Sequence, residues 1–403
     1  MKTLKSLLIQ GPGPSSSHTI GPFRIVQQFL SEIHREEVEK IDVTLYGSLA
    51  LTGKGHFTDR IIEKALHGYP CEIHFDPVLK GLTHPNTMTC AARYKNGTVY
   101  SQRYLSIGGG AFMKEGGHYE EKDVYPFNTF SEMTIYMEEN KIEDMYELVT
   151  TFEDPDIFTY GKEQLLSSFQ TIERSLEDLS LLPGELKLKA VSNHIRNKAQ
   201  ETSDPGEKRI LYLTAYAYAT AEANARGDMV ITAPTCGSAG VVPAVLYYEY
   251  KNLHVSLERL VKAYLVGALV CDFIKQNASL SGALLGCQAE IGSAASFAAS
   301  SLCYLNNLNN QQIEYGAEVA MEHFLGLTCD PVNGYVQIPC IERNAMASIH
   351  AYASYLFAKD ISAYRKNRVS FDNVIKAMRD TGDKLSSDLK ETSLGGLAKV
   401  IIC

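Results

Sequence analysis

The chain lacks any excess of positive charge. Its 403 residues include 38 basic and 47 acidic side chains, which gives a formal net charge of −9. Nucleic-acid-binding proteins usually carry a basic field, so we expect no nucleic-acid partner. Hydrophobic residues at 45% and charged residues at 21% are ordinary values for a globular protein. The length is sufficient for two domains, each with a sizeable core.

The sequence also lacks a run that would cross or enter a membrane. The apolar stretch within residues 1–14 is too short for a secretory signal and has no small-residue cleavage site. The most apolar later stretch, 279–302, contains Gln288 and Glu290 and is rich in Ala, Ser and Gly. This composition predicts a buried helix or helix pair rather than a membrane span. We therefore expect a cytoplasmic protein that does not bind membranes.

The first part of the chain mixes strand and helix patterns. Apolar and polar residues alternate in 41–50 and 71–78, which predicts strands. Segment 20–33 has apolar residues at helical spacing, with Pro22 in its first turn, which predicts a helix. These elements indicate a compact α/β domain over residues 1–150.

The second part is dominated by helix patterns. From residue 209 onward Ala, Leu, Ile and Tyr recur at helical spacing, which predicts helices at 211–228, 257–276 and 341–360. The fold class that we predict is an α/β N-terminal domain followed by a mostly α-helical C-terminal domain. The helical domain covers residues 151–403 and ends in a C-terminal tail, with the junction at 150–160.

Hydroxyl side chains are concentrated in GPGPSSSHTIGPFR, residues 11–24. Ser15, Ser16, Ser17 and Thr19 stand with His18 between Gly/Pro turns and a helix start. Unpaired N–H groups at a helix N-terminus, with hydroxyls beside them, bind carboxylates or phosphates. The missing Gly-Lys-Ser/Thr argues against a phosphate-binding P-loop. A helix cap needs only one hydroxyl, so this cluster favours a ligand site over a simple cap.

Two histidines follow in turn-like segments. His56 lies in GSLALTGKGHFTDR, residues 47–60, and His84 lies in THPNTM, residues 83–88. A loop histidine can titrate near neutral pH, but each of these alone is more typical of a surface histidine. The glycine run in SIGGGAF, residues 106–112, allows close backbone approach and does not have the spacing of a dinucleotide fingerprint.

A second candidate anion site is TAPTCGSAGVVPAVL, residues 232–246. Its small residues precede an apolar helix, so Thr235, Ser238 and the backbone N–H groups up to Gly240 could act as donors. A tight turn between helices explains the same residues equally well.

Nine cysteines are present, an odd number, and seven of them lie in the second half of the chain. Disulfides are a poor explanation in the cytoplasm, and Cys71, Cys90, Cys271 and Cys303 are typical of small apolar residues. The other cysteines have more distinctive surroundings and are Cys236, Cys287, Cys329, Cys340 and Cys403.

Cys287, Cys329 and Cys340 have the loop contexts of metal ligands. Cys287 follows a glycine, Cys329 precedes Asp-Pro, and Cys340 follows Pro339 at a predicted helix start. A helix N-terminus favours the thiolate form that binds metals. Their spacings, 42 and then 11 residues, match no short zinc or ferredoxin pattern. The chain ends on Cys403 after an apolar stretch, which favours docking of the tail over fraying.

Taken together, these segments resemble the iron–sulfur-dependent L-serine dehydratases (L-serine ammonia-lyases) of the single-chain type, with a β domain followed by an α domain. The resemblance extends over nearly the whole chain. It is carried by GPSSSHTIGP, YGSLALTGKGH, HPN, SIGGG, TAPTCGSAGVVPAV, GCQAEIG, EHFLGLTCDPVNGYVQIPCIERNA and KETSLGGLA.

The resemblance implies a 4Fe–4S cluster with one open iron, held by Cys287, Cys329 and Cys340. It implies that Cys403 caps the open iron until substrate displaces it. The catalytic histidines would be His18, His56 and His84, with the general base unassigned. The implied substrate-binding residues are Ser15, Ser16, Ser17, Thr19, Thr235, Ser238 and Gly240. Some relatives carry Asn where this chain has Cys236, which makes Cys236 a poor fourth ligand.

The expected reaction is the β-elimination of L-serine to pyruvate and ammonia. An open iron acts as a Lewis acid on the hydroxyl, and a base removes the Cα proton. Because the serine loop and the cysteines belong to different domains, we expect the site between them. Lyases of the same type that act on cysteine or threonine, and a non-catalytic zinc or iron–sulfur sensor, remain alternatives. The apolar helices also allow a homodimer.

Overall fold

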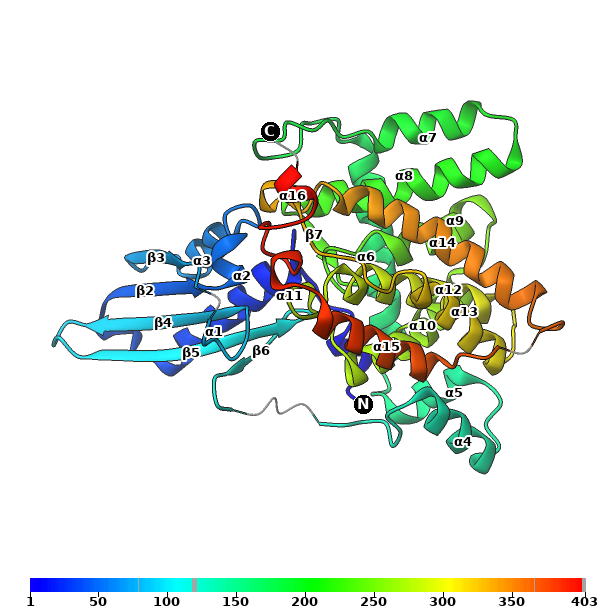
Figure 1. The fold of residues 1–403 in the computed structure, drawn as a ribbon, viewed down its shortest axis with the longest axis horizontal. Helices are drawn as coiled ribbons and strands as arrows, with labels where there is room; N and C mark the ends of the chain where they lie inside the picture. Colours follow the sequence, from blue (N-terminus) through cyan, green and yellow to red (C-terminus); the bar gives the residue numbers. More distant parts are fainter. Residues whose placement is uncertain (79, 118–121, 366, 401–403) are drawn as a thin grey trace.

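A computed structural model describes residues 1–78, 80–117, 122–365 and 367–400. A sheet with three flanking helices forms one side of the molecule, and a bundle of helices forms the other (Figure 1). The predicted fold class, an α/β N-terminal part followed by a mostly helical part, is confirmed. Among the described helices none is both long enough and apolar enough to cross a membrane.

The sheet has five strands in the order β3-β2-β4-β5-β6. β2 and β3 are parallel, and the other neighbours are antiparallel. The strands are β2 (Val38–Tyr46), β3 (Cys71–Asp76), β4 (Thr87–Tyr94), β5 (Val99–Gly108) and β6 (Ala111–Lys114), and the helices are α1 (Gly21–Glu32), α2 (Ser48–Leu51) and α3 (Thr58–Ala65). Parallel neighbours need a crossover connection, which α2 and α3 supply between β2 and β3. Alternate residues of β2, such as Ile41, Val43 and Leu45, are buried in this core.

The strand predicted at 41–50 is shorter than expected. It ends at Tyr46, and residues 48–50, predicted as strand, belong to α2. Gly47 turns the chain at φ +55°, a conformation that L residues rarely adopt. The turn directs the carbonyl of Ser48 toward the serine-rich loop, where it contacts the ring of His18.

The helical part is centred on α12. This helix packs against α9, α10, α13 and α14, and nearly all of its residues are buried. Its small Ala and Ser side chains let the neighbouring helices approach closely. The contact with α10 is so close that a Cβ added at Gly267 would collide with the Ser301 hydroxyl. The helices are α4 (Phe130–Asn140), α5 (Met145–Phe152), α6 (Ile157–Glu177), α7 (Ser192–Glu201), α8 (Pro205–Arg226), α9 (Val241–Asn252), α10 (Leu257–Asn277), α11 (Gly282–Leu285), α12 (Ile291–Leu305), α13 (Asn310–Glu322), α14 (Cys340–Asp360), α15 (Phe371–Lys384) and α16 (Leu397–Val400).

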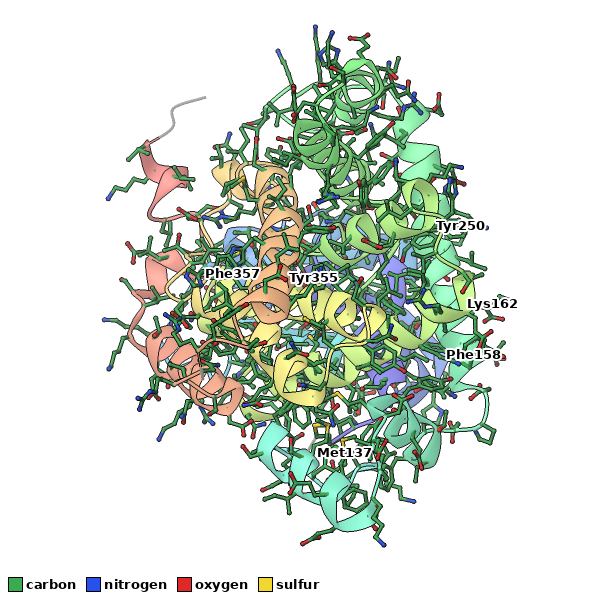
Figure 2. All side chains as sticks on the ribbon, turned by 90° about the vertical axis from the view of Figure 1, so that its right-hand side faces the viewer. Met137, Phe158, Lys162, Tyr250, Tyr355 and Phe357 are labelled. Atoms are coloured by element: carbon green, nitrogen blue, oxygen red, sulfur yellow. The ribbon has the colours of Figure 1, made fainter. Side chains whose placement is uncertain are left out.

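The helices predicted from periodicity correspond to α1, α8, α10 and α14. The apolar stretch 279–302 forms α11, the short 3-10 turn Cys287–Ala289 and most of α12, as a buried helix pair requires. Figure 2, which looks onto the helical side, shows how densely the side chains fill it. Periodicity was informative here because each helix contributes an apolar face to a common core.

Three segments connect the two sides. Met1, Leu4, Leu7 and Leu8 are buried in the helical core, and the chain then passes to the sheet side. β1 (Gln10–Pro12) pairs with β7 (Met229–Ile231) of the helical side. Residues 386–397, here called the C-terminal strap, lie between the two sides and are drawn in red in Figure 1. The domain boundary at residue 150 stays a prediction, and the helical core also includes residues of α4 and α5.

Candidate active site

The three cysteines singled out in the sequence line one cavity. This cavity has a volume of about 20 Å³ and is lined by Ser15, His56, Gly237, Cys287, Glu290, Ile291, Cys329, Pro331, Val336, Cys340 and Glu391. Ser15 and His56 come from the sheet side, and the other lining residues come from the helical side and the strap. All three cysteines have free thiols. Residues from the two sides of the molecule therefore meet at the same site.

Local structure explains how each thiol reaches the cavity. Cys287 follows Gly286, whose φ of +76° ends α11 and starts the 3-10 turn. The Cys329 N–H donates to Leu389 O at 2.8 Å, so the strap holds the loop before α14. Cys340 follows Pro339 and is the first residue of α14. Both later cysteines thus lie at loop or helix-start positions, where their side chains are free to point inward.

Arg343 lies among the three sulfurs. Its guanidinium donates to Thr328 O at 2.8 Å and to Asp330 Oδ1 at 3.4 Å. A hydrogen bond from the Cys329 thiol, supported by Arg343, lowers the pKa of Cys287 despite burial. The same bond, followed by burial, raises the pKa of Cys329. Three thiols that line one cavity beside a partly buried cation fit the ligand set of a metal centre bound by three thiolates.

The serine loop, residues 15–19, encloses the ring of His18, so that this ring is not exposed to solvent. Residues Ser16–Ile20 form a short π-helical turn that leads into α1. The Nε2 of His18 lies 3.2 Å from Ser48 O and 2.9 Å from Thr52 Oγ1. Because a carbonyl oxygen only accepts, the His18 proton lies on Nε2, and Nδ1 accepts from the Ser17 hydroxyl at 3.0 Å. Both ring nitrogens are engaged, and the ring is fully buried.

In His56 the proton lies on the other ring nitrogen. Its Nδ1 lies 2.9 Å from the carbonyl oxygen of Thr52, so the proton lies on Nδ1. Nε2 therefore carries the lone pair and lies 3.7 Å from Oε1 of Glu391, which lines the same cavity as His56. Burial lowers the pKa of His56 to about 4, so its imidazole is neutral at neutral pH. The ring stacks on His18 with centroids 4.4 Å apart, which fixes its orientation.

Glu391 of the strap is a site residue that the sequence reasoning missed. Its Oε1 lies 3.3 Å from Ser15 Oγ and 3.3 Å from His18 Nδ1, while Oε2 is buried and has no hydrogen-bond partner in the described chain. The ligand atoms of His18, His56 and Glu391 lie within 4.8 Å of one another, a spacing that would suit a metal ion. Since both nitrogens of His18 are already engaged, we assign a hydrogen-bonded cluster instead.

Glu290 is the second missed residue. The Thr235 hydroxyl donates to its Oε1 at 2.7 Å and lies 3.0 Å from the Ser238 hydroxyl. Burial raises the pKa of Glu290 to about 8, and the nearby Glu391 adds to this effect. A Cβ on Gly282 would lie 2.9 Å from Glu290 Oε2. The only signals in the sequence were the positions of these acids in GCQAEIG and KETSLGGLA, among small residues next to predicted site segments.

The remaining predicted residues lie around this site. Ser16 Oγ accepts from Cys236 N at 3.4 Å, and the Thr19 hydroxyl donates to Ser15 O at 2.6 Å. The Gly240 N–H donates to Asn344 Oδ1 at 2.9 Å, so it is not free for an anion. None of these residues lines the cavity described above.

His84 is buried but does not line the cavity. Its Nδ1 accepts from Asn86 N at 3.0 Å, while its Nε2 has no partner in the described part of the chain. Its loop is nevertheless close to the site, since Ser48 N donates to Pro85 O at 2.9 Å. Cys403, the predicted cap on the open iron, lies outside the described residues.

These features define a class of enzyme whose active site is shared between a sheet-based part and a helical part of one chain. Residues 4–77 match the family model of the serine dehydratase beta chain, and residues 135–398 match that of the serine dehydratase alpha chain. The chain belongs to the serine dehydratase family, with both parts joined in one polypeptide, and it is a lyase.

Similar curated proteins support the assignment over the full length. The L-serine dehydratase of Haemophilus influenzae is 35% identical, with 98% of each chain covered. That of Helicobacter pylori strain 26695 is 36% identical, covering 100% of this chain and 99% of the relative. L-serine dehydratase 1 of Escherichia coli K12 is 34% identical, with 100% of each chain covered.

Proposed function

We propose that this enzyme dehydrates L-serine to pyruvate and ammonia in the cytoplasm, using a 4Fe–4S cluster held by Cys287, Cys329 and Cys340. The observation that carries the proposal is that these three thiols line the same cavity as a histidine nitrogen with a free lone pair. The relatives named above are L-serine dehydratases, which supports the same substrate. When bound, the cluster would supply a Lewis acid for departure of the serine hydroxyl.

His56 is the base that the geometry favours. Its Nδ1–H is held by the Thr52 carbonyl, which leaves Nε2 to accept the Cα proton of the substrate. His18 is a positioning residue in this proposal, because it uses both nitrogens to hold the serine loop against Ser48 and Thr52. The resulting aminoacrylate tautomerises to an imine, which water hydrolyses to pyruvate and ammonia.

Ser15 is the hydroxyl of the serine loop that lines the cavity, and it donates to Glu391 Oε1 at 3.3 Å. In this proposal it rotates away from Glu391 to donate to the substrate carboxylate. Ser17 orients His18, while Ser16 and Thr19 shape the loop through backbone contacts. Thr235 and Ser238 act through Glu290, and Gly240 leaves room beside Ala217 and Asn344. His84 remains proposed as a further catalytic residue because its Nε2 is buried with no partner in the described chain.

Cys403 is proposed to cap the open iron in the resting enzyme. The Cys403→Ala variant should then keep the fold but change the activation lag or the rate of bleaching in air. An unchanged lag and an unchanged rate of bleaching would contradict the cap. A homodimer is proposed as well, and sedimentation at micromolar concentration would test it.

An anaerobic preparation tests the proposed function directly. Cluster-loaded protein should show a broad visible absorption that bleaches in air, and it should form pyruvate from L-serine. A colourless, zinc-containing protein would refute the cluster, and a coloured protein that makes no pyruvate would favour a sensor. Assays with L-threonine and L-cysteine would measure side activities, because one extra methyl group is rejected only weakly.

A further inference from the structure

Two carboxyl groups face the cavity. Glu290 comes from the helical side, directly before α12, and Glu391 comes from the C-terminal strap. Each is held through one oxygen by a hydroxyl group. Glu290 Oε1 accepts from Thr235 Oγ1 at 2.7 Å, and Glu391 Oε1 accepts from Ser15 Oγ at 3.3 Å. This leaves the second oxygen of each carboxyl for another contact.

No Lys or Arg within the described chain forms an ion pair with either group. Glu391 Oε2 is buried with no hydrogen-bond partner in the same part of the chain. A buried carboxylate without an ion-pair partner costs several kcal/mol unless a ligand or a proton compensates it. Within the described chain the nearest cation that acts on the pair is therefore Arg343, which influences Glu290 without forming an ion pair with it.

Backbone positions keep space for this pair. A Cβ on Gly237 would lie 3.0 Å from Glu290 Oε1, and one on Gly282 would lie 2.9 Å from Glu290 Oε2 and 3.3 Å from Cys329 Sγ. Glycine at both positions leaves space for the Glu290 carboxyl next to the side of the cavity that the three cysteines line. Glu290 and Glu391 thus line the same cavity as the thiols that would hold the metal centre.

We infer that Glu290 and Glu391 together bind the α-ammonium group of the substrate and so select α-amino acids over α-hydroxy acids. This inference rests on the proposed function. An ammonium group offers three N–H donors and one positive charge, which matches two carboxyl groups without an ion-pair partner, one of which has a buried oxygen, Glu391 Oε2, with no donor in the described chain. When the ammonium group binds Glu391, the Ser15 hydroxyl is released from Glu391 Oε1 for the substrate carboxylate. The side of the cavity lined by Cys287, Cys329 and Cys340 is left for the β-hydroxyl.

The matched ligands for the test are L-serine and L-glycerate. They have the same configuration and size, and they differ only in an ammonium group against a hydroxyl group at Cα. Glu290→Gln and Glu391→Gln keep the shape of each side chain, but the amide cannot become a carboxylate when the ammonium group binds. In anaerobic, cluster-loaded protein we expect each variant to raise the KM for L-serine about 10-fold or more, since a lost charged hydrogen bond has this magnitude. The inhibition constant of L-glycerate should stay the same or become smaller.

A readout that does not depend on turnover accompanies the kinetics. The shift in melting temperature produced by saturating L-serine should shrink in both variants, and that produced by L-glycerate should not. Glu318→Gln is the control, because Glu318 is also a buried carboxyl but lies in α13 and does not line the cavity. Its KM and inhibition constant should equal those of the wild type.

Three outcomes would overturn the inference. Equal weakening of L-serine and L-glycerate would mean that the carboxyls only maintain the structure. A large fall in kcat at unchanged KM would mean that they act on a proton instead. A KM for L-serine and an inhibition constant for L-glycerate that both equal the wild-type values would mean that the ammonium binds elsewhere. A wild-type enzyme that forms no pyruvate would instead refute the proposed function, so the two failures are distinguishable.

Discussion

The backbone N–H of Glu391 donates to the carbonyl oxygen of Cys329 at 2.7 Å. The Cys329 N–H in turn donates to Leu389 O at 2.8 Å, so both backbone groups of this cysteine are bonded to the C-terminal strap. The Ser48 hydroxyl donates to Glu391 O at 2.6 Å from the sheet side. A single segment near the end of the chain therefore links the cysteine loop to the histidine cluster.

The first prediction concerns the anchor of this strap. Asp330 Oδ2 accepts from Leu397 N at 2.8 Å, and its Oδ1 accepts from Thr328 Oγ1 at 3.0 Å. Asp330→Ala should lower the free energy of unfolding by about 1–3 kcal/mol, because partly buried donors lose their acceptor. Amide hydrogen exchange of residues 389–397 should become faster. The exposed Asp156→Ala serves as the control, and unchanged exchange in Asp330→Ala would contradict the anchoring role.

The second prediction concerns the metal ligands. Single Ala variants of Cys287, Cys329 and Cys340 should lose the visible absorption and the activity together, because a three-thiolate site has no spare ligand. Cys271→Ala and Cys303→Ala are matched controls, since both thiols are buried within helices α10 and α12. Anaerobic iron and sulfide analysis would check the result. A cluster retained at full occupancy in any of the three variants would exclude that cysteine as a ligand.

The third prediction concerns the base. His56→Asn keeps a donor for the Thr52 carbonyl and removes the nitrogen that faces the cavity. We expect kcat to fall by about 10²–10⁴-fold, the usual contribution of a general base, while KM changes little. Steady-state kinetics with L-serine, together with the absorption spectrum, would measure this effect. His74→Asn, on the surface of β3, is the control, and near-normal kcat in His56→Asn would assign the base elsewhere.

The fourth prediction concerns the space beside Glu290. Gly282→Ala would place a methyl group 2.9 Å from Glu290 Oε2 and 3.3 Å from Cys329 Sγ. We expect lower iron content and weaker binding of L-serine. Gly206→Ala is the comparison, because its nearest neighbour is the flexible carboxylate of Asp204 at 3.3 Å in the exposed first turn of α8. Equal iron content in the two variants would argue against a tight fit at Gly282.

The fifth prediction concerns pH. Burial lowers the pKa of His84 to about 4, whereas in the unfolded chain it returns to about 6.5. Between these values the unfolded state binds more protons, so stability is intact above pH 6.5 and falls as the pH drops toward 4. The slope is about 1.4 kcal/mol per pH unit for this one group.

Denaturation at pH 7.5 and at pH 5 would measure this contribution. The wild type should lose about 1–2 kcal/mol more than His84→Asn over that interval, following the same linkage. The exposed His34→Asn is the control. If His84→Asn and the wild type lose the same free energy of unfolding between pH 7.5 and pH 5, His84 contributes nothing to the loss of stability in acid.

Much of the fold could be predicted because its elements follow local rules. Helices α8, α10 and α14 were recognised from apolar spacing, and α1 from spacing and Pro22. The error at residues 48–50 arose from Gly47, whose positive φ ends the strand, since alternation alone does not reveal where a chain turns.

The sequence by itself determined the cysteine positions, the hydroxyl-rich loop and the elements that carry them, because motifs and periodicity are local properties of a chain. Only the tertiary structure decided which side chains share the cavity. It showed that His18 is enclosed, that His56 presents its Nε2, and that Glu290 and Glu391 complete the wall. Burial and the direction of a lone pair depend on residues far apart in the chain, such as Ser48, Thr52 and the strap, and no local pattern encodes them.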